Sequence, residues 1–394
     1  MEYDVIVVGG GPSGATAAAY LAGSGHSVLV LEKGPRGRSK PCAGGLTASA
    51  VSELGFHLPR SVLGRPIYAL RLVCCGRTRE VRRKEPFMWV TRRDLLDQYL
   101  LDNAARAGAT VQNEEAAIDI SRTQAGVTVT TRAGSYRGRL LILASGVRSG
   151  LVRKAGLHIT TPLGWCTVAV VPASNIAPDD TVLVEYDFGG KGYGWAFPGV
   201  NYMNIGYGCH PPLSSQVGTL FESFVSSHGL PEPKTRAVWP VPLGGGGRFS
   251  LSADSAIVVG DAAGMADPFT GEGLRYAFRS GRLAAQAAGA ALSAYWYPPK
   301  SALSCYDRAC RASIFRELAA ARRVVCAASK LHRLFERVML RPGMAESIQD
   351  LLTGRGGYGA LAARALLCMF SAGSGPAGRP EPITSEVSQG DGPP

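Results

Sequence analysis

The first thirty or so residues constrain the fold of this chain more than any other segment. They begin with a short apolar run rich in valine, Tyr3–Gly9, which predicts a buried parallel strand. A glycine-rich turn and an alanine-rich helix follow, from about Ser13 to Gly23, and a second strand is expected over Ser27–Glu32. A βαβ unit of about thirty residues is typical of one nucleotide-binding half of a Rossmann-type parallel sheet.

The turn between the first strand and the helix carries the G-x-G-x-x-G pattern, at Gly9, Gly11 and Gly14. Gly9 permits the tight turn, Gly11 lets a pyrophosphate approach the backbone, and Gly14 lets the helix pack closely on the strand. Pro12 and Ser13 open the helix, where phosphate oxygens meet free N–H groups and the positive end of the helix dipole. The pattern therefore predicts a dinucleotide site.

Glu32 ends the second strand, where a carboxylate can accept hydrogen bonds from ribose hydroxyls, and Lys33 follows it at the same edge. A carboxylate at this point repels a 2′-phosphate. FAD or NAD is therefore expected at the site rather than NADP.

A second segment far downstream favours FAD over NAD. The run AIVVG ends in Gly260–Asp261, and in many flavoproteins such a segment places the aspartate on the ribityl chain. A loop with Pro268, Gly271 and Gly273 then leads into a helix. The positive end of that helix would point at the flavin pyrimidine and favour its anionic reduced form. We expect FAD to be bound non-covalently.

With two further motifs, these segments resemble the geranylgeranyl reductase family, within the larger group that includes aromatic hydroxylases related to p-hydroxybenzoate hydroxylase. The two motifs are Lys40–Gly45 (KPCAGG) and Tyr193–Pro198 (YGWAFP), and together they are more specific than the glycine patterns. The run Thr91–Asp97 also fits an R-x-x-(apolar)-D pattern of the larger group, which implicates Arg93 as an FAD contact. The likeness spans residues 3–282.

The resemblance implies hydride transfer from reduced FAD to carbon–carbon double bonds of a polyprenyl chain, carried by a prenyl lipid or a prenyl diphosphate. Tyr193 and Trp195 stand two apart, so on a strand they point to the same side, and Phe197 shares that face. Their aromatic faces would stabilise positive charge developing on a tertiary carbon. The alternative is an ordinary aromatic pair in the core of a sheet.

Cys42 lies in the loop between Lys40 and a pair of glycines, Gly44 and Gly45, which we expect to contact substrate. A neighbouring lysine would lower the pKa of the thiol and make it reactive. The sulfur could then donate a proton beside the flavin or shape the substrate channel. The alternative is a small packing residue in a tight loop.

The expected fold class is α/β, with a Rossmann-type FAD-binding domain, an inserted and mostly antiparallel β-sheet domain for substrate, and a helical C-terminal region. A tail rich in Gly, Pro, Ser and acidic residues is expected to be disordered. The FAD-binding domain is predicted to comprise 1–65, 90–162 and 245–298. The substrate domain comprises 66–89 and 163–244. The helical region is 299–370 and the tail is 371–394.

Composition narrows the partners and the location. The net charge is +12, but no nucleic-acid motif accompanies it, so no nucleic-acid partner is expected. None of the nine cysteines falls in a C-x-x-C pair, which makes a reducing cytosol the simpler assumption. The six histidines form no metal-binding spacing, and no metal is predicted.

The segment 308–341 carries nine Lys or Arg residues against two acidic ones, Glu317 and Glu336, with apolar residues interleaved. A basic amphipathic helix can lie on an anionic membrane, which would give peripheral contact on the inner face. It can equally be a packed C-terminal helix with a solvated face.

Two other functions and the electron source remain open from sequence. One alternative is a flavin-dependent monooxygenase or halogenase, for which Lys84 is the only candidate lysine. The other is an electron-relay flavoprotein that docks an electron-donor protein. The larger group carries Asp-Gly where this chain has Ser145–Gly146, which argues against hydroxylase-like handling of NADPH. The reductant, NAD(P)H or reduced ferredoxin, is therefore undecided.

Overall fold

A computed structural model describes most of the chain, and the tail predicted to be disordered lies outside the described residues. The described residues are 2–123, 126–147, 149–172, 179–187, 192–211, 213–247 and 249–370.

An eight-stranded sheet contains the N-terminal strand, in the order β17-β18-β11-β1-β2-β8. All neighbours from β18 to β8 pair in parallel, and a helix lies on the connection from β1 to β2 and on the connection from β2 to β8. The hairpin β9–β10 adds antiparallel strands to β11. The bounds are β1 Glu2–Val8, β2 Val28–Leu31, β8 Thr110–Gln112, β9 Asp119–Thr123, β10 Gly126–Thr130, β11 Ser135–Leu143, β17 Ser252–Ala253 and β18 Ala256–Val258.

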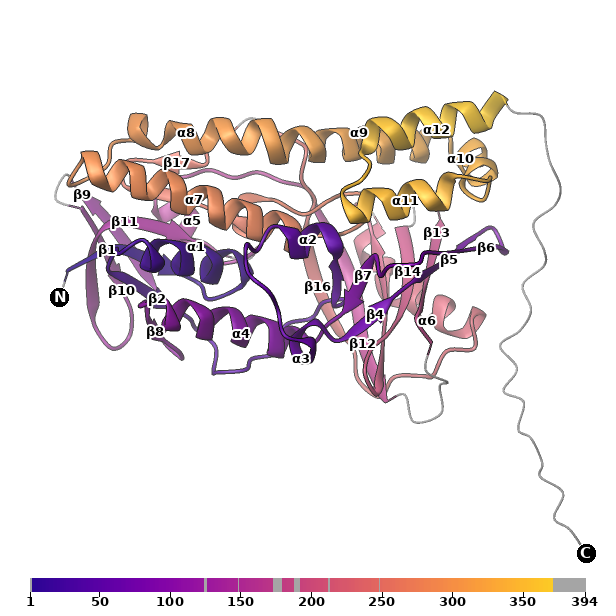
Figure 1. The fold of residues 1–394 in the computed structure, drawn as a ribbon, viewed down its shortest axis with the longest axis horizontal. Coiled ribbons are helices and arrows are strands. Elements are labelled where there is room, and N and C mark those ends of the chain that lie inside the picture. Colours follow the sequence, from indigo (N-terminus) through magenta and orange to yellow (C-terminus); the bar gives the residue numbers. More distant parts are fainter. Residues whose placement is uncertain are drawn as a thin grey trace, which may run out of the picture.

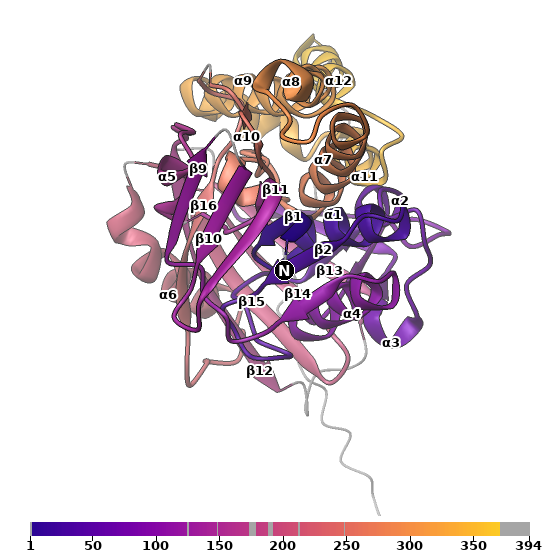
Figure 2. The same cartoon turned by 90° about the vertical axis from the view of Figure 1, so that its left-hand side faces the viewer.

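Three helices pack beside this sheet: α1 (Pro12–Gly23), α4 (Arg93–Arg106) and α7 (Leu274–Ala294). Glycine allows α7 to cross α1 closely, because a Cβ at Gly281 would stand 2.4 Å from the Ser13 carbonyl oxygen. In Figures 1 and 2, α7 lies between α1 and the C-terminal helices. The predicted Rossmann-type unit is confirmed.

A seven-stranded sheet lies beside the first, in the order β16-β12-β15-β14-β13-β5-β6 (Figure 1). Every pair is antiparallel except β13 with β5, so the prediction of a mostly antiparallel sheet is confirmed. Helix α6 (Val217–Ser227) packs on it through Phe221 and Phe224. The bounds are β5 Ala69–Cys74, β6 Arg77–Arg82, β12 Leu163–Pro172, β13 Thr181–Asp187, β14 Gly192–Pro198, β15 Tyr202–Cys209 and β16 Ala237–Pro242.

Short elements connect the two sheets. A three-stranded sheet, β3-β7-β4, contains the residues that follow the KPCAGG motif. The bounds of these elements are β3 Gly45–Thr47, β4 Arg65–Ile67, β7 Met88–Val90, α2 Ala48–Ser52, α3 Arg60–Leu63 and α5 Leu151–Lys154. The strands of 66–89 and of 163–244 thus mostly share one sheet, while the exact domain boundaries stay a prediction.

The C-terminal region is helical, as predicted, and covers the top of the molecule in both views (Figures 1 and 2). A π-helical turn over Arg311–Phe315 joins its first two helices. No helix in the described ranges is long and apolar enough to cross a bilayer. The bounds are α8 Lys300–Cys310, α9 Arg316–Lys330, α10 His332–Met339, α11 Met344–Thr353 and α12 Tyr358–Phe370.

The apolar residues of 308–341 mostly face the protein core. Ile314, Leu318, Phe335 and Val338 are buried, which favours the packed-helix interpretation of this segment. Among the described residues of α8 to α12 and the turns between them, the exposed large apolar side chains are Leu331, which is 53% exposed, and two residues of α12, Leu366 and Leu367, which are 55% and 65% exposed.

Candidate active site

One cavity of about 780 Å³ runs from the glycine turn of the first sheet to the inner face of the second. Its wall includes the end of β2, the loop 40–45, strand β14 and the loop that leads into α7. It brings together most of the residues that the sequence motifs singled out. The predicted residues on its wall are Gly9, Gly11, Pro12, Ser13, Glu32, Lys33, Cys42, Gly45, Arg93, Tyr193, Trp195, Phe197, Asp261, Pro268, Gly271 and Gly273.

Three predicted glycines lie behind the wall rather than on it, and each is needed for close packing. A Cβ at Gly14 would stand 2.0 Å from the Gly9 carbonyl oxygen, and one at Gly260 would stand 2.6 Å from Ser13 Oγ. Gly44 has a φ of +74°, and a Cβ there would stand 2.4 Å from the Thr91 carbonyl oxygen. Gly44 therefore shapes the loop and is not among the residues that line the cavity, and its expected contact with substrate stays a prediction.

The glycine turn leaves room for a phosphate. A Cβ at Gly11 would meet only one atom within 4 Å, Arg38 Nη2 at 3.7 Å, and no side chain caps the helix α1 that begins there. Ser145 Oγ is buried on the same wall and has no hydrogen-bond partner in the described part of the chain. Free helix N–H groups and an unsatisfied hydroxyl fit a bound dinucleotide.

Groups of the protein itself hold the Glu32 carboxylate in place. It accepts hydrogen bonds from the backbone N–H groups of Gly10 (2.7 Å) and Gly34 (2.8 Å). Arg38 Nε stands 2.9 Å from the same carboxylate. The sequence reasoning missed Arg38, while Lys33 is exposed at the rim of the cavity.

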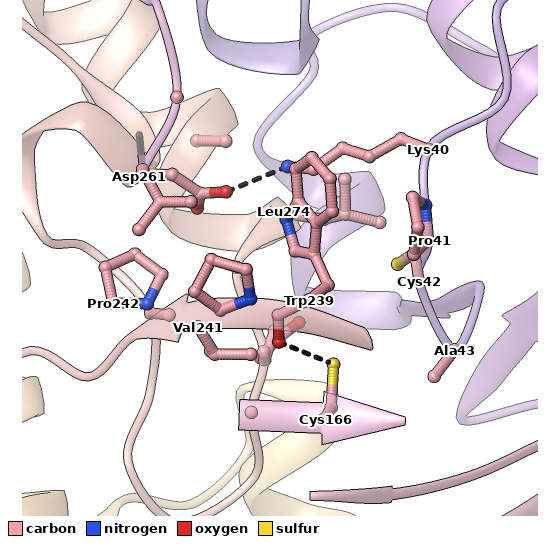
Figure 3. A pocket seen from close by; sticks show the side chains of 18 of the residues that line it. Lys40, Pro41, Cys42, Ala43, Cys166, Trp239, Val241, Pro242, Asp261 and Leu274 are labelled. Atoms are coloured by element: carbon pink, nitrogen blue, oxygen red, sulfur yellow. Dashed lines mark hydrogen bonds and ion pairs between the residues drawn. The ribbon is translucent and has the colours of Figure 1, made fainter. Parts of the chain in front are cut away.

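Lys40 and Asp261 form an ion pair across the cavity wall, with Nζ 2.9 Å from Oδ2 (Figure 3). Burial alone would raise the pKa of Asp261, but the Lys40 ammonium outweighs burial and lowers it. Lys40 was expected to act on Cys42, and it pairs with Asp261 instead.

Arg93 of α4 places a cation beside Cys42. Its guanidinium makes two hydrogen bonds to the Asp97 carboxylate, at 2.9 and 3.0 Å. Burial would lower the pKa of Arg93, but Asp97 and the sulfur of Cys42 together raise it. Arg93 therefore stays charged on the wall beside Cys42, whose Sγ accepts a hydrogen bond of 3.4 Å from the Gly44 N–H.

The aromatic residues of β14 share one face, as the alternation of a strand predicts. The ring centroids of Tyr193 and Trp195 are 5.8 Å apart, and those of Trp195 and Phe197 are 6.4 Å apart. Tyr193 donates a hydrogen bond of 2.8 Å to the Thr270 carbonyl oxygen. A Cβ at Gly271 would stand 2.1 Å from the Tyr193 hydroxyl oxygen, so glycine there lets the ring pack against the loop.

Asn204 of β15 connects this aromatic face to the cysteine loop. The indole N–H of Trp195 donates to Asn204 Oδ1 at 2.9 Å, and Asn204 Nδ2 donates to the Cys42 carbonyl oxygen at 2.8 Å. The sequence reasoning missed Asn204. It also missed Trp239, a further aromatic residue on the wall, whose carbonyl oxygen accepts a weak hydrogen bond from Cys166 (Figure 3).

This fold and this site define an FAD-dependent oxidoreductase. Residues 2–190 match the FAD binding domain family. Digeranylgeranylglycerophospholipid reductase 1 of Methanothermobacter thermautotrophicus is 30% identical over 339 residues, which cover 80% of this chain and 84% of the relative. The chain belongs to the geranylgeranyl reductase family.

Solved structures share the fold at lower identity. A geranylgeranyl bacteriochlorophyll reductase-like protein from Thermoplasma acidophilum matches with a TM-score of 0.76 and 23% identity, over 93% of this chain and 96% of that chain. The flavin-dependent brominase Bmp2 matches with a TM-score of 0.67 and 19% identity, over 93% of this chain and 98% of that chain. The architecture therefore serves more than one chemistry.

Proposed function

We propose that the protein reduces carbon–carbon double bonds of a polyprenyl chain carried by a prenyl lipid or prenyl diphosphate. The observation that carries this proposal is the continuity of the cavity. The same cavity is lined by the cofactor residues, by the aromatic face of β14 and by apolar side chains of β5, β13 and α11. These apolar residues are Leu70, Leu72, Val182, Val184, Ile348 and Leu352.

The residues divide into two groups by task. FAD would be held by the glycine turn, Ser145, Glu32 and Asp261, with Arg93 beside the cysteine loop, and once reduced it supplies hydride. An isolated trisubstituted alkene has no carbonyl to absorb charge, so protonation of one carbon must accompany hydride addition at the other. Tyr193 and Trp195 would face the positive charge that develops on the tertiary carbon and stabilise it.

Cys42 has two candidate roles in this scheme, as a proton donor or as a shape-determining residue of the channel. Its thiol lies on the cavity wall next to the charged Arg93. Its backbone carbonyl is tied through Asn204 to Trp195. These hydrogen bonds support the role of Cys42 in shaping the channel, because they hold the loop at a set distance from Trp195.

The decisive experiment is anaerobic. The FAD-loaded protein is reduced chemically, a geranylgeranyl lipid is added, and product masses are measured. The expected product gains two hydrogens for each reduced bond. Product that forms only after oxygen is admitted, and that carries oxygen or halogen, would replace this proposal with the monooxygenase or halogenase alternative. Lys84 does not support that alternative, because it is exposed and does not line the cavity.

We also propose peripheral contact with the inner face of a membrane, since the substrate is a lipid. The basic side chains of 308–341 that face outward include Arg316, Arg323, Lys330 and Arg333. Three exposed leucines, Leu331 between α9 and α10 and Leu366 and Leu367 of α12, lie in the same C-terminal region. The electron source, NAD(P)H or a reduced ferredoxin docked as a donor protein, stays undecided.

A further inference from the structure

Glu272 is an acidic residue on the cavity wall that the scheme above does not use. It precedes helix α7, between Gly271 and Gly273. Its carboxyl Oε1 accepts a short hydrogen bond from Thr47 Oγ1 of β3. Both side chains line the cavity. The described residues provide Glu272 with no ion pair, so its charge is not neutralised by a bonded cation.

The charged groups around Glu272 each have another partner. Arg275, in the first turn of α7, pairs with Glu317, with Nη1 and Oε2 3.2 Å apart. Asp267 is buried and accepts hydrogen bonds from Tyr276 and Tyr358. Asp261, near Gly273, is paired with Lys40.

This environment favours the neutral acid. Burial raises the pKa of Glu272 to about 7, against the opposing effects of the Thr47 hydrogen bond and of Arg275. Asp267 and Glu317 add to the rise. A carboxylic acid with such a pKa can hold a proton at neutral pH and release it during a reaction.

We infer that Glu272 donates the proton in the reduction of the double bond, an inference that rests on the proposed function. The O–H bond of the Glu272 carboxyl group breaks as a C–H bond forms at one alkene carbon. Hydride from reduced FAD forms the second C–H bond at the other carbon, and FAD is left oxidised. The Glu272 carboxylate then takes a proton from water. Cys42 keeps the task of shaping the channel.

The test compares wild type with Glu272→Gln, because glutamine keeps an oxygen to accept from Thr47 and cannot donate a titrating proton. Single-turnover oxidation of chemically reduced enzyme by a geranylgeranyl lipid is followed without oxygen across pH 5 to 9. We expect the wild-type rate to be level at low pH and to fall about tenfold per unit above pH ~7. The variant should be slower by about 100-fold or more, with a flat profile.

A second readout needs neither flavin nor substrate. In flavin-free protein, the Glu272 pKa lies above its unfolded value, so its favourable contribution to stability is present at low pH and is lost as pH rises toward 7. Wild type should therefore lose melting temperature relative to Glu272→Gln between about pH 4.5 and 7. Glu222→Gln, at an exposed ion pair with Arg236, is the matched control and should follow wild type in both assays.

The possible failures are distinguishable. A wild type that reduces no double bond at any pH overturns the proposed function and this inference with it. A wild type that is active, with a Glu272→Gln variant of equal rate and the same pH profile, overturns the inference alone. If the pH dependence is lost in Cys42→Ser and kept in Glu272→Gln, the proton donor is Cys42 and not Glu272.

Discussion

The Lys40 ammonium and the Asp261 carboxylate, 221 residues apart in the sequence, meet at 2.9 Å on the cavity wall. This ion pair ties the cysteine loop to the segment that is expected to hold the ribityl chain of FAD. The KPCAGG motif and the Gly260–Asp261 segment are therefore joined physically, and loss of either partner should affect both.

Asp261→Asn should weaken FAD binding by roughly tenfold or more, because a charged hydrogen bond contributes about 1.5–3 kcal/mol. The lowered pKa of Asp261 also gives a pH dependence. The ionised Asp261 contributes to the free energy of folding above the ordinary aspartate pKa near 4. This contribution is lost as pH falls through the lower pKa of the folded state. Flavin fluorescence on release measures both effects. Equal affinity in wild type and variant would mean that Asp261 does not contact the cofactor.

Trp195→Phe should lower turnover while FAD content stays near normal. Phenylalanine keeps an aromatic face but cannot donate to Asn204, which leaves a buried amide oxygen unpaired at a cost of about 1–3 kcal/mol. Trp195→Ala should lose more turnover, at a cost that could reach about 2–4 kcal/mol. Rates and flavin content are measured together. Loss of FAD or unfolding in the phenylalanine variant would assign Trp195 to the sheet core, where it is only 3% exposed.

Cys42→Ser should keep FAD and slow the reaction by less than about 100-fold, the lower end of what a general acid contributes. The reason is that the backbone of the loop, and not the thiol, bonds to Asn204. The pH profile of single turnover should match that of wild type. A flat profile would show that the thiol, rather than a carboxyl group, supplies the proton.

Replacing both Leu366 and Leu367 with serine should weaken binding to vesicles of anionic lipid by more than tenfold. Burying a leucine side chain in an apolar phase contributes about 1.5–3 kcal/mol, and both residues are exposed on α12. Val170→Ser, at an exposed site on β12, is the matched control. Cosedimentation with vesicles measures the effect, and unchanged binding would exclude α12 from the contact.

Sequence reasoning succeeded where local spacing determines geometry. The turn at Gly9 and Gly11 was predicted, since a strand followed by that pattern leaves few conformations. The shared face of Tyr193 and Trp195 follows from strand alternation alone. It failed where distant segments meet. Asn204 acts because β15 pairs with β14, and the partner of Lys40, Asp261, comes from the segment that follows β18. Neither relationship leaves a periodic signal in the sequence.

The continuity of the cavity has a practical consequence for handling the protein. The space expected for the flavin and the space expected for hydrocarbon belong to one cavity, as the described residues line it. Detergent or adventitious lipid could therefore enter the cofactor space of flavin-free protein and compete with reconstitution. Flavin occupancy after purification should depend on the extraction conditions, and a preparation that lacks colour need not have lost its native structure.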